Sequence, residues 1–339
     1  GFDSWIVKIN SSGVIQWQKA LGGTGDDRAT SIKPTTDGGY IFAGYTTSNN
    51  GDVSGNNGGN DCWVVKLSSS GGIQWQKTVG GSQMDIANSI EITSDGGYIV
   101  GCYTNSTNKD VSNNHGEFDF WAVKLDTYGV IQWQKCLGGT GIDYGQKVKV
   151  THDNGYIFTG YTRSNNGDVT GNHGEADFWV VKLDGSGSLR WQKTMGGSGV
   201  DTPFSVWPTK DGGFIVAGST TSNDGDVTSL PGAGYVDFWV VKLGKDPSLP
   251  VRWLSVDATL NGNTLQVDWK VASETNTAHF EVQASDDGIH FSKIGENIGS
   301  KVTNGNPDLN NSYHFSYTFN CYLLGSGIVI SLLGWLLAF

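Results

Sequence analysis

Residues 61–118 read DCWVVKLSSSGGIQWQKTVGGSQMDIANSIEITSDGGYIVGCYTNSTNKDVSNNHGEF, and near-copies of this 58-residue stretch fill the chain as far as residue 243. A repeat of this size is one supersecondary unit that cannot bury its apolar face alone, so the copies are expected to stack on one another. The tryptophans that keep the register, and that we expect to be structural, are Trp5, Trp63, Trp121, Trp179 and Trp239 at the head of successive copies, with Trp17, Trp75, Trp133 and Trp191 twelve residues behind the first four.

Each repeat reads as four β-strands. Trp63 to Leu67 is a short β-branched run, and Gly72 to Val79 alternates apolar and polar side chains, which is strand periodicity. Ala87 to Thr93 and Gly97 to Tyr103 give a third and a fourth strand, joined by a tight Asp-Gly turn. Four antiparallel strands per repeat, arranged radially, predict an all-β fold, a β-propeller whose blades are the repeats. A β-solenoid is the competing arrangement.

The number of blades follows from the register of the copies. Copies begin near residues 3, 61, 119 and 177, which predicts four complete blades, and a lone first strand follows at residues 237–243. That strand is explained if it completes a blade whose other strands precede residue 1, so we expect at least five blades in the intact ring. Two long connections per repeat should emerge on one face, where loops on a rigid scaffold often carry function.

The composition changes after a linker at residues 244–250. Residues 251–319 contain five strand-like runs and are expected to form an incomplete immunoglobulin-like or fibronectin-like β-sandwich with Trp269 in its core. The tail, residues 320–339, is apolar and carries no charge from Cys321 onward. It could be a membrane anchor, a pair of sandwich strands, or an aberrant terminus.

Composition excludes several functions. The 339 residues carry a net charge of −11, with 50 glycines and only 16% charged residues, so a turn-rich β protein that binds neutral sugars or cations is favoured and nucleic-acid binding is not expected.

No C-x-x-C pair occurs, and we expect the first three cysteines to be small buried side chains. The four cysteines are Cys62, Cys102, Cys136 and Cys321.

Aspartates recur at fixed places in the two long loops. Carboxylates among asparagines and backbone carbonyls suit Ca²⁺, although turns to the local backbone are the alternative and the one we favour. The possible calcium ligands are Asp27, Asp85, Asp143 and Asp201, and the candidate binding residues in the other long loop are Asp52, Asp110, Asp168 and Asp226.

Two more charged positions recur around the first strand. An aspartate two residues before each leading Trp is expected to fix the loop-to-strand junction through backbone N–H groups; these are Asp3, Asp61, Asp119, Asp177 and Asp237. A lysine inside the same apolar strand is expected to pair with a repeat aspartate, because unpaired burial is costly. If the first strand lined the central channel, these lysines could instead attract an anion.

The motifs resemble a known group of bacterial proteins. DFWVVKLDGSGSLRWQKTMGGSGVD at residues 177–201 and DGGYIVGCYT at residues 95–104 resemble propeller-type repeats of proteins exported by the type IX secretion system. Residues 249–295 resemble the immunoglobulin-like or fibronectin-like module that precedes their sorting domain. The resemblance implies an extracellular or cell-surface location and no particular reaction.

A weaker resemblance connects the G-x-x-x-W segment, Gly71 to Trp75, to the tryptophan-docking motif of quinoprotein (PQQ-like) propellers. In that family the glycine makes a turn and the tryptophan packs between neighbouring blades. Nothing here matches the quinone site, so only the packing role is carried over.

The sequence therefore predicts a non-catalytic, secreted or surface-exposed binding or adhesion scaffold, with a glycan or protein as ligand and no cofactor apart from possible calcium. Loop aromatics that could stack on sugars are Tyr144, Phe204 and Tyr235. Catalysis is not expected, since every loop carboxylate has look-alikes in the other copies whereas acid–base catalysis needs two different environments. The alternative is an accessory region of a polysaccharide-degrading enzyme whose catalytic domain lies upstream.

Overall fold

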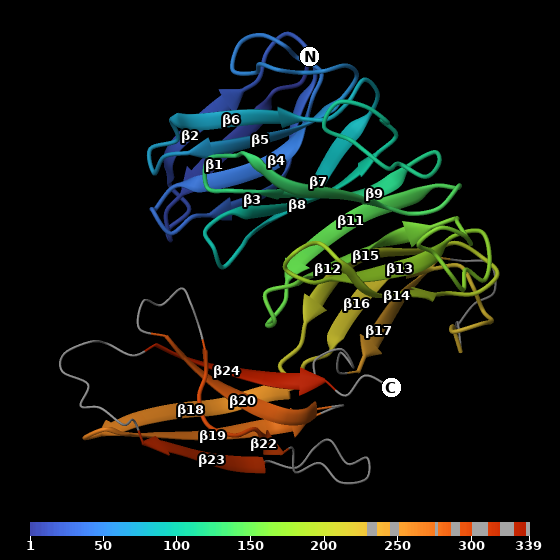
Figure 1. The fold of residues 1–339 in the computed structure, drawn as a ribbon. Helices are drawn as coiled ribbons and strands as arrows, with labels where there is room; N and C mark the ends of the chain where they lie inside the picture. The colour runs from blue at the N-terminus through green and yellow to red at the C-terminus, as the bar shows by residue number, and fades with distance from the viewer. Residues whose placement is uncertain are drawn as a thin grey trace. The chain divides into compact units, whose positions relative to one another are not determined.

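A computed structural model divides the chain into two compact units, Gly1–Lys245 and Asp246–Phe339, which are described separately below (Figure 1). Within the described residues every regular element is a β-strand and none is a helix, so the all-β prediction is confirmed. The structure describes residues 1–228, 236–244, 251–274, 277–285, 292–299, 311–318 and 329–336.

The first unit is a row of antiparallel sheets. Its strands pair as a two-stranded sheet (β1–β2), three four-stranded sheets (β3–β6, β7–β10, β11–β14) and a three-stranded sheet (β15–β17). In chain order they are β1 (Ser4–Ile9), β2 (Ile15–Leu21), β3 (Asp27–Pro34), β4 (Tyr40–Thr46), β5 (Asp61–Leu67), β6 (Ile73–Val79), β7 (Asp85–Ile92), β8 (Tyr98–Thr104), β9 (Asp119–Leu125), β10 (Ile131–Leu137), β11 (Asp143–Val150), β12 (Tyr156–Thr162), β13 (Asp177–Leu183), β14 (Leu189–Met195), β15 (Asp201–Pro208), β16 (Phe214–Thr220) and β17 (Asp237–Leu243).

The sheets are out of phase with the sequence repeat, which corrects the predicted blade composition. Each complete sheet takes the third and fourth strands of one copy and the first and second strands of the next, in the order third–fourth–first–second. The described residues therefore form three complete four-stranded sheets, not four. The strand at residues 237–243 is not a lone strand either, because β17 pairs with β16 along its whole length, from Asp237↔Thr220 to Leu243↔Phe214.

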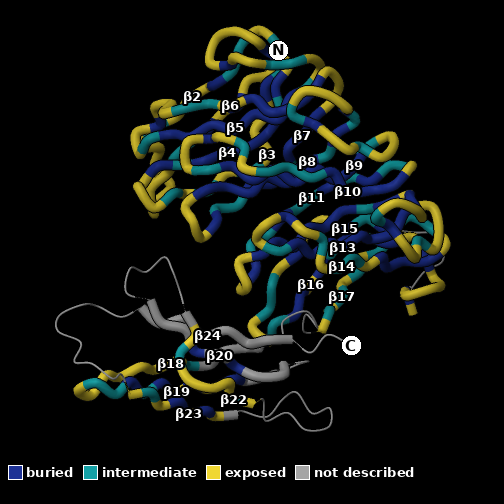
Figure 2. Tube along the Cα trace, viewed as in Figure 1, coloured by how far each residue is buried: buried dark blue, intermediate teal, exposed yellow. Residues whose placement is uncertain are grey.

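Burial explains why the sheets have this phase. The first strands β5, β9 and β13 are buried at every position, and the fourth strands β8 and β12 are buried at all but one. Strands that are apolar on both faces belong in the middle of a sheet, so the first and fourth strands pair with each other. The second strand alternates apolar and polar residues in its sequence and stays half-exposed at an edge of the sheet, as in β6. Figure 2 shows the buried stretches along the central strands and the exposed ones in the loops.

The third strands form the other edge. β3, β7, β11 and β15 lie next to one another across successive sheets. The Glu91 carboxylate on β7 is 2.8 Å from the Lys33 Nζ on β3 and 2.6 Å from the Lys149 Nζ on β11. The third strands therefore run along this common edge. An anion-binding role for the repeat lysines would need the first strands, which carry those lysines, at this edge instead.

The hydrophobic cores lie between neighbouring sheets. One core joins Cys62, Val64 and Val79 from the β3–β6 sheet to Ile90 and Trp121 from the β7–β10 sheet. Burying apolar faces against the next sheet is what a stacked repeat requires. The cysteines Cys62, Cys102 and Cys136 are free and buried, as predicted, while Cys321 lies outside the described residues.

The second unit consists of two sheets with a common core. One sheet contains β18 (Val251–Asn261), β19 (Thr264–Glu274) and β23 (Asn311–Thr318), and the other contains β20 (Thr277–Ser285), β21 (Ser292–Lys293), β22 (Ile298–Gly299) and β24 (Val329–Leu336). Trp269 is buried in the core as predicted, stacked on Tyr313 at 5.4 Å between ring centroids and edge-on to Phe280.

The described part of the apolar tail is a sheet strand. β24 pairs antiparallel with β20, from Ser285↔Val329 to Thr277↔Leu336. This arrangement agrees with the second of the three predicted roles for residues 320–339, that of sandwich strands. In the described part of the chain, no helical segment has the length and hydropathy needed to span a bilayer.

Candidate binding face of the repeat unit

The two long connections of each repeat meet at one end of the sheets. The within-sheet loop, residues 105–118 in the second copy, joins a fourth strand to a first strand, and the between-sheet loop, residues 80–84, leads to the next sheet. Asp110 N–H donates to the Gly80 carbonyl at 3.3 Å, and Gly80 N–H donates to the Asp110 carboxylate at 3.2 Å. The same reciprocal contact occurs at Asp52–Gly22, Asp168–Gly138 and Asp226–Gly196. We call this surface the loop face.

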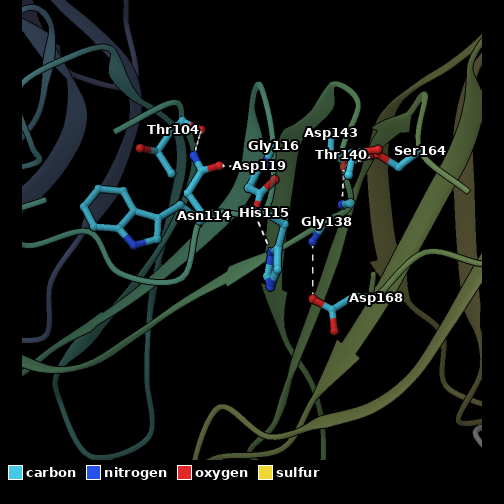
Figure 3. A network of polar contacts seen from close by, with 12 residues as sticks. Thr104, Asn114, His115, Gly116, Asp119, Gly138, Thr140, Asp143, Ser164 and Asp168 are labelled. Atoms are coloured by element: carbon cyan, nitrogen blue, oxygen red, sulfur yellow. Dashed lines mark hydrogen bonds and ion pairs between the residues drawn. The ribbon is translucent and has the colours of Figure 1, made fainter. Parts of the chain in front are cut away.

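The candidate binding aspartates of the within-sheet loops thus hold the two loops together. Figure 3 shows one of these contacts, from the Gly138 backbone to the Asp168 carboxylate. Asp168 is partly exposed at the loop face.

The possible calcium ligands are fully buried at the first residue of each third strand. The Asp143 carboxylate accepts hydrogen bonds from Thr162 Oγ1, from Ser164 Oγ at 2.7 Å and from Gly139 N–H at 2.8 Å. Asp27 and Asp85 repeat the same three contacts, and Asp201 has the serine and glycine contacts. Burial raises the pKa of Asp85 and Asp143, and these donors oppose the rise. These residues anchor the between-sheet loop.

The aspartates ahead of the first strands fix the loop-to-strand junction, as predicted. Asp119 Oδ2 accepts the backbone N–H of His115 at 2.8 Å and lies 2.7 Å from the Nδ1 of the same histidine (Figure 3). Asp61 Oδ2 accepts the Asn57 N–H, and Asp177 Oδ2 accepts the His173 N–H. Burial raises the pKa of Asp61 to about 7 and that of Asp119 to about 6, and neighbouring aspartates add to both shifts. The sequence signal for these buried acids was their fixed place before an apolar strand.

Tyr144 lies in an aromatic cluster at the loop face. Its ring centroid is 4.4 Å from that of Tyr103, 5.1 Å from Phe118 and 5.2 Å from Tyr161. All four rings are partly exposed. They lie at the loop ends of their strands, because Phe118 O accepts the N–H of Asp143, the residue before Tyr144.

This cluster occurs at one junction only among the described repeats. The residues equivalent to Tyr144 are Arg28, Ile86 and Thr202, and those equivalent to Phe118 are Phe2, Asn60, Ala176 and Val236. The aromatic cluster therefore breaks the symmetry of an otherwise repetitive face. Alignment of the copies with one another could have found it, since Tyr144 differs from the other copies at its position.

The other two candidate aromatics are not in this cluster. Phe204, which is 54% exposed, occupies the bulge of β15. Its equivalents Thr30 and Asn88 donate side-chain hydrogen bonds to carbonyls of the following sheet, at 2.7 and 2.8 Å. Phe204 therefore belongs to a surface where sheets meet. Tyr235 lies outside the described residues.

The repeat tryptophans occupy two packing positions. Trp63, Trp121 and Trp179 are fully buried, Trp239 is partly buried and Trp5 is 66% exposed. The second-strand tryptophans Trp17, Trp75 and Trp133 each lie over a turn glycine of the next sheet, at Gly71, Gly129 and Gly187 respectively. Trp191 packs near Phe214 with the two rings tilted, at 5.8 Å between their centroids.

Comparison with known proteins finds no matching family model and no curated protein that is similar to the chain. Among the described residues, no group of three or more His, Cys, Asp or Glu side chains has the arrangement of a metal site.

Proposed function

We propose that the repeat unit is a non-catalytic binding scaffold that recognises a neutral glycan through the loop face at the aromatic cluster. The observation that carries the proposal is the four partly exposed rings of Tyr103, Phe118, Tyr144 and Tyr161, surrounded by Asn, Asp and Ser-rich loops. Aromatic rings supply apolar contact for a sugar face, and a few polar groups fix its orientation. The net charge of −11 disfavours anionic ligands.

The loop carboxylates support a non-catalytic role. Asp143 is committed to three donors of its own loops, and Asp168 is bound to Gly138 N–H. The same contacts recur in the other copies, which supports a structural role for these carboxylates.

A glycan array probed with the whole chain tests this proposal. We expect a defined set of neutral glycans to bind, and Tyr144→Ala to weaken that binding at least tenfold because the central ring of the cluster is lost. Tyr128→Ala is the matched control, since Tyr128 is 80% exposed in the β9–β10 turn at the opposite end of the sheets. A flat array profile, or equal losses in both variants, contradicts the proposal.

We further propose that the row of sheets is part of a β-propeller with the third strands nearest the axis. The support is the succession β3, β7, β11, β15 along one edge and the half-exposed second strands at the other. Electron microscopy of the protein checks this arrangement. Sheets placed around an axis are the expected result, and a straight stack contradicts it.

The extracellular or cell-surface location is proposed from the resemblance of residues 177–201 and 249–295 to type IX secretion substrates. Fractionation of the producing cells, followed by detection of the chain in the medium or on the surface, tests it.

A further inference from the structure

Two buried carboxylates converge at each complete junction between sheets. A Cβ atom placed on Gly138 would lie 2.6 Å from Asp119 Oδ1 and 2.6 Å from Asp143 Oδ2, so both oxygens face the same side of this glycine. Asp119 begins β9 of one sheet and Asp143 begins β11 of the next. The equivalent positions are Gly80 with Asp61 and Asp85, and Gly196 with Asp177 and Asp201; Gly22 lies in the same way between Asp3 and Asp27, but there Asp3 is exposed.

At least one carboxylate oxygen in each pair has no hydrogen-bond partner, and in the Asp177–Asp201 pair Asp201 Oδ1 lacks one as well. Asp119 Oδ1 is buried and accepts no hydrogen bond, and the same is true of Asp61 Oδ1 and Asp177 Oδ1. The three aspartates are 0% exposed. A buried carboxylate oxygen without a donor is costly, and here the same atom is left without a partner at three equivalent places. The repetition indicates that the fold leaves this oxygen for a ligand.

The surrounding charge is negative at every junction. The Asp168 carboxylate accepts the Gly138 N–H and adds negative charge nearby, without completing a group of three metal-ligating side chains among the described residues. Within the described residues, no lysine or arginine forms an ion pair with Asp119, Asp143 or Asp168, and the one basic group there is His115. A group of this kind favours a bound cation.

We propose that each of these three junctions binds one calcium ion between the aspartates of neighbouring sheets. The two carboxylates favour a hard cation, and Ca²⁺ tolerates sites in which carboxylates are completed by backbone carbonyls and water. Because each pair spans two sheets, the ion links one sheet to the next. This role differs from the ligand binding proposed above and stands independently of it.

Calorimetric titration of the chelator-treated whole chain with CaCl₂ at neutral pH tests the proposal. We expect three ions per chain, with dissociation constants of about 10⁻⁴ M or weaker as in extracellular calcium modules. Thermal unfolding should move upward by several degrees in CaCl₂ and less in MgCl₂, since Mg²⁺ demands a stricter octahedral geometry. No binding heat together with an unchanged unfolding temperature overturns the proposal, and shows that protons or water satisfy these oxygens.

Single-site variants locate the ions. Asp119→Asn should lower the stoichiometry from three to two, and Asp177→Asn should do the same independently. Asp126→Asn is the control, because Asp126 accepts backbone hydrogen bonds in the β9–β10 turn, away from the loop face. Three ions in the folded Asp119 and Asp177 variants overturn the assignment. Should neither variant fold, the titration of the unmodified chain decides.

Discussion

The lysines inside the first strands β5, β9 and β13 are buried charges that aspartates of the repeat unit compensate. Lys182 is 1% exposed, and its Nζ lies 2.7 Å from the Asp153 carboxylate and 3.1 Å from the Leu183 carbonyl. Lys66 and Lys124 repeat this arrangement with Asp37 and Asp95. The predicted pairing with repeat aspartates is confirmed. The aspartate comes from the turn between the third and fourth strands, so the pair ties that turn to the centre of the sheet.

Removing the lysine should lower the free energy of unfolding more where the ion pair is buried than where it is exposed. Lys182→Met leaves Asp153 without its cation and should lower the free energy of unfolding by about 3 kcal/mol. Lys242→Met is the control at the equivalent position, where both side chains are largely exposed, at 43% and 56%, and it should have a much smaller effect. Denaturant unfolding of both variants measures the difference. Equal effects would contradict the role of burial.

The buried aspartates predict that stability falls as the pH rises from about 4 to 7 in calcium-free buffer. The pKa of Asp61 is about 7 and that of Asp119 about 6, against 3.8 for an ordinary carboxyl group. Over this interval the folded chain holds protons that the unfolded chain has released, so raising the pH favours unfolding. Urea unfolding at several pH values in chelator checks the slope. Asp61→Asn should flatten it, and a curve that rises instead would contradict the raised pKa values.

The sequence predicts where these aspartates lie. It does not predict that they are buried with a raised pKa and with one carboxylate oxygen that has no hydrogen-bond partner. The position of Asp119 before an apolar strand predicts a junction contact, and that contact is local in sequence. The surroundings of the unpartnered Oδ1 depend on Gly138, which follows β10 of the same sheet, and on Asp143, which begins β11 of the next sheet. No local sequence pattern predicts that these residues meet.

At the level of elements, the turn between the first and second strands of one sheet packs against a tryptophan of the preceding sheet. Gly129 has φ +81°, and a Cβ there would lie 2.9 Å from the Trp75 ring of the preceding sheet. Trp17 over Gly71 adds a hydrogen bond from its Nε1 to the Ser69 carbonyl at 3.0 Å. The turn needs glycine both for its left-handed backbone and for the space under the indole.

Two glycine substitutions separate these requirements. Gly212→Ala changes a residue with φ +83° and open space around it, and should cost about 1 kcal/mol from the backbone alone. Gly129→Ala adds a clash with Trp75 and should cost about 3 kcal/mol in total. Thermal or denaturant unfolding compares the two. If they are equally destabilised, the tryptophan does not depend on that glycine.

Strand positions were predictable, whereas sheet membership was predicted wrongly. Alternation and turn residues place β5 to β8 within a few residues, because these signals are local. Assigning the sheets requires knowing that β8 pairs with β9 across residues 105–118, from Tyr98↔Leu125 to Thr104↔Asp119. The uniformly apolar composition of the first and fourth strands marks them as central, and weighing burial ahead of loop length would have given the correct phase.

In the repeat unit as a whole, Glu91 forms ion pairs that link the third strands of three neighbouring sheets. Glu91 contacts both Lys33 and Lys149, and Lys149 also lies over the Trp207 ring at 4.2 Å. Burial lowers the pKa of Lys147, and the nearby Lys149 and Lys33 lower it further. The edge therefore carries an excess of positive charge that Glu91 offsets.

Neutralising this acid should weaken the association of the sheets. Glu91→Gln leaves the three lysines facing one another and should cost about 1–2 kcal/mol at low ionic strength. The deficit should shrink in 0.5 M NaCl, because about 0.5 M salt screens the repulsion. Unfolding measured at both salt concentrations checks this, with the exposed Glu117→Gln as control. A deficit that does not depend on salt would contradict an electrostatic origin.

Every hydrophobic core of the first unit is formed by residues of two adjacent sheets. No sheet therefore has a hydrophobic core of its own. Removing one exposes the apolar faces of both neighbours, so cooperativity runs along the row and loss of order is expected to begin at its two ends and travel inward. The middle sheets, which have a neighbour on each side, are thereby expected to be the most stable sheets of the first unit, and the cluster of four rings lies there.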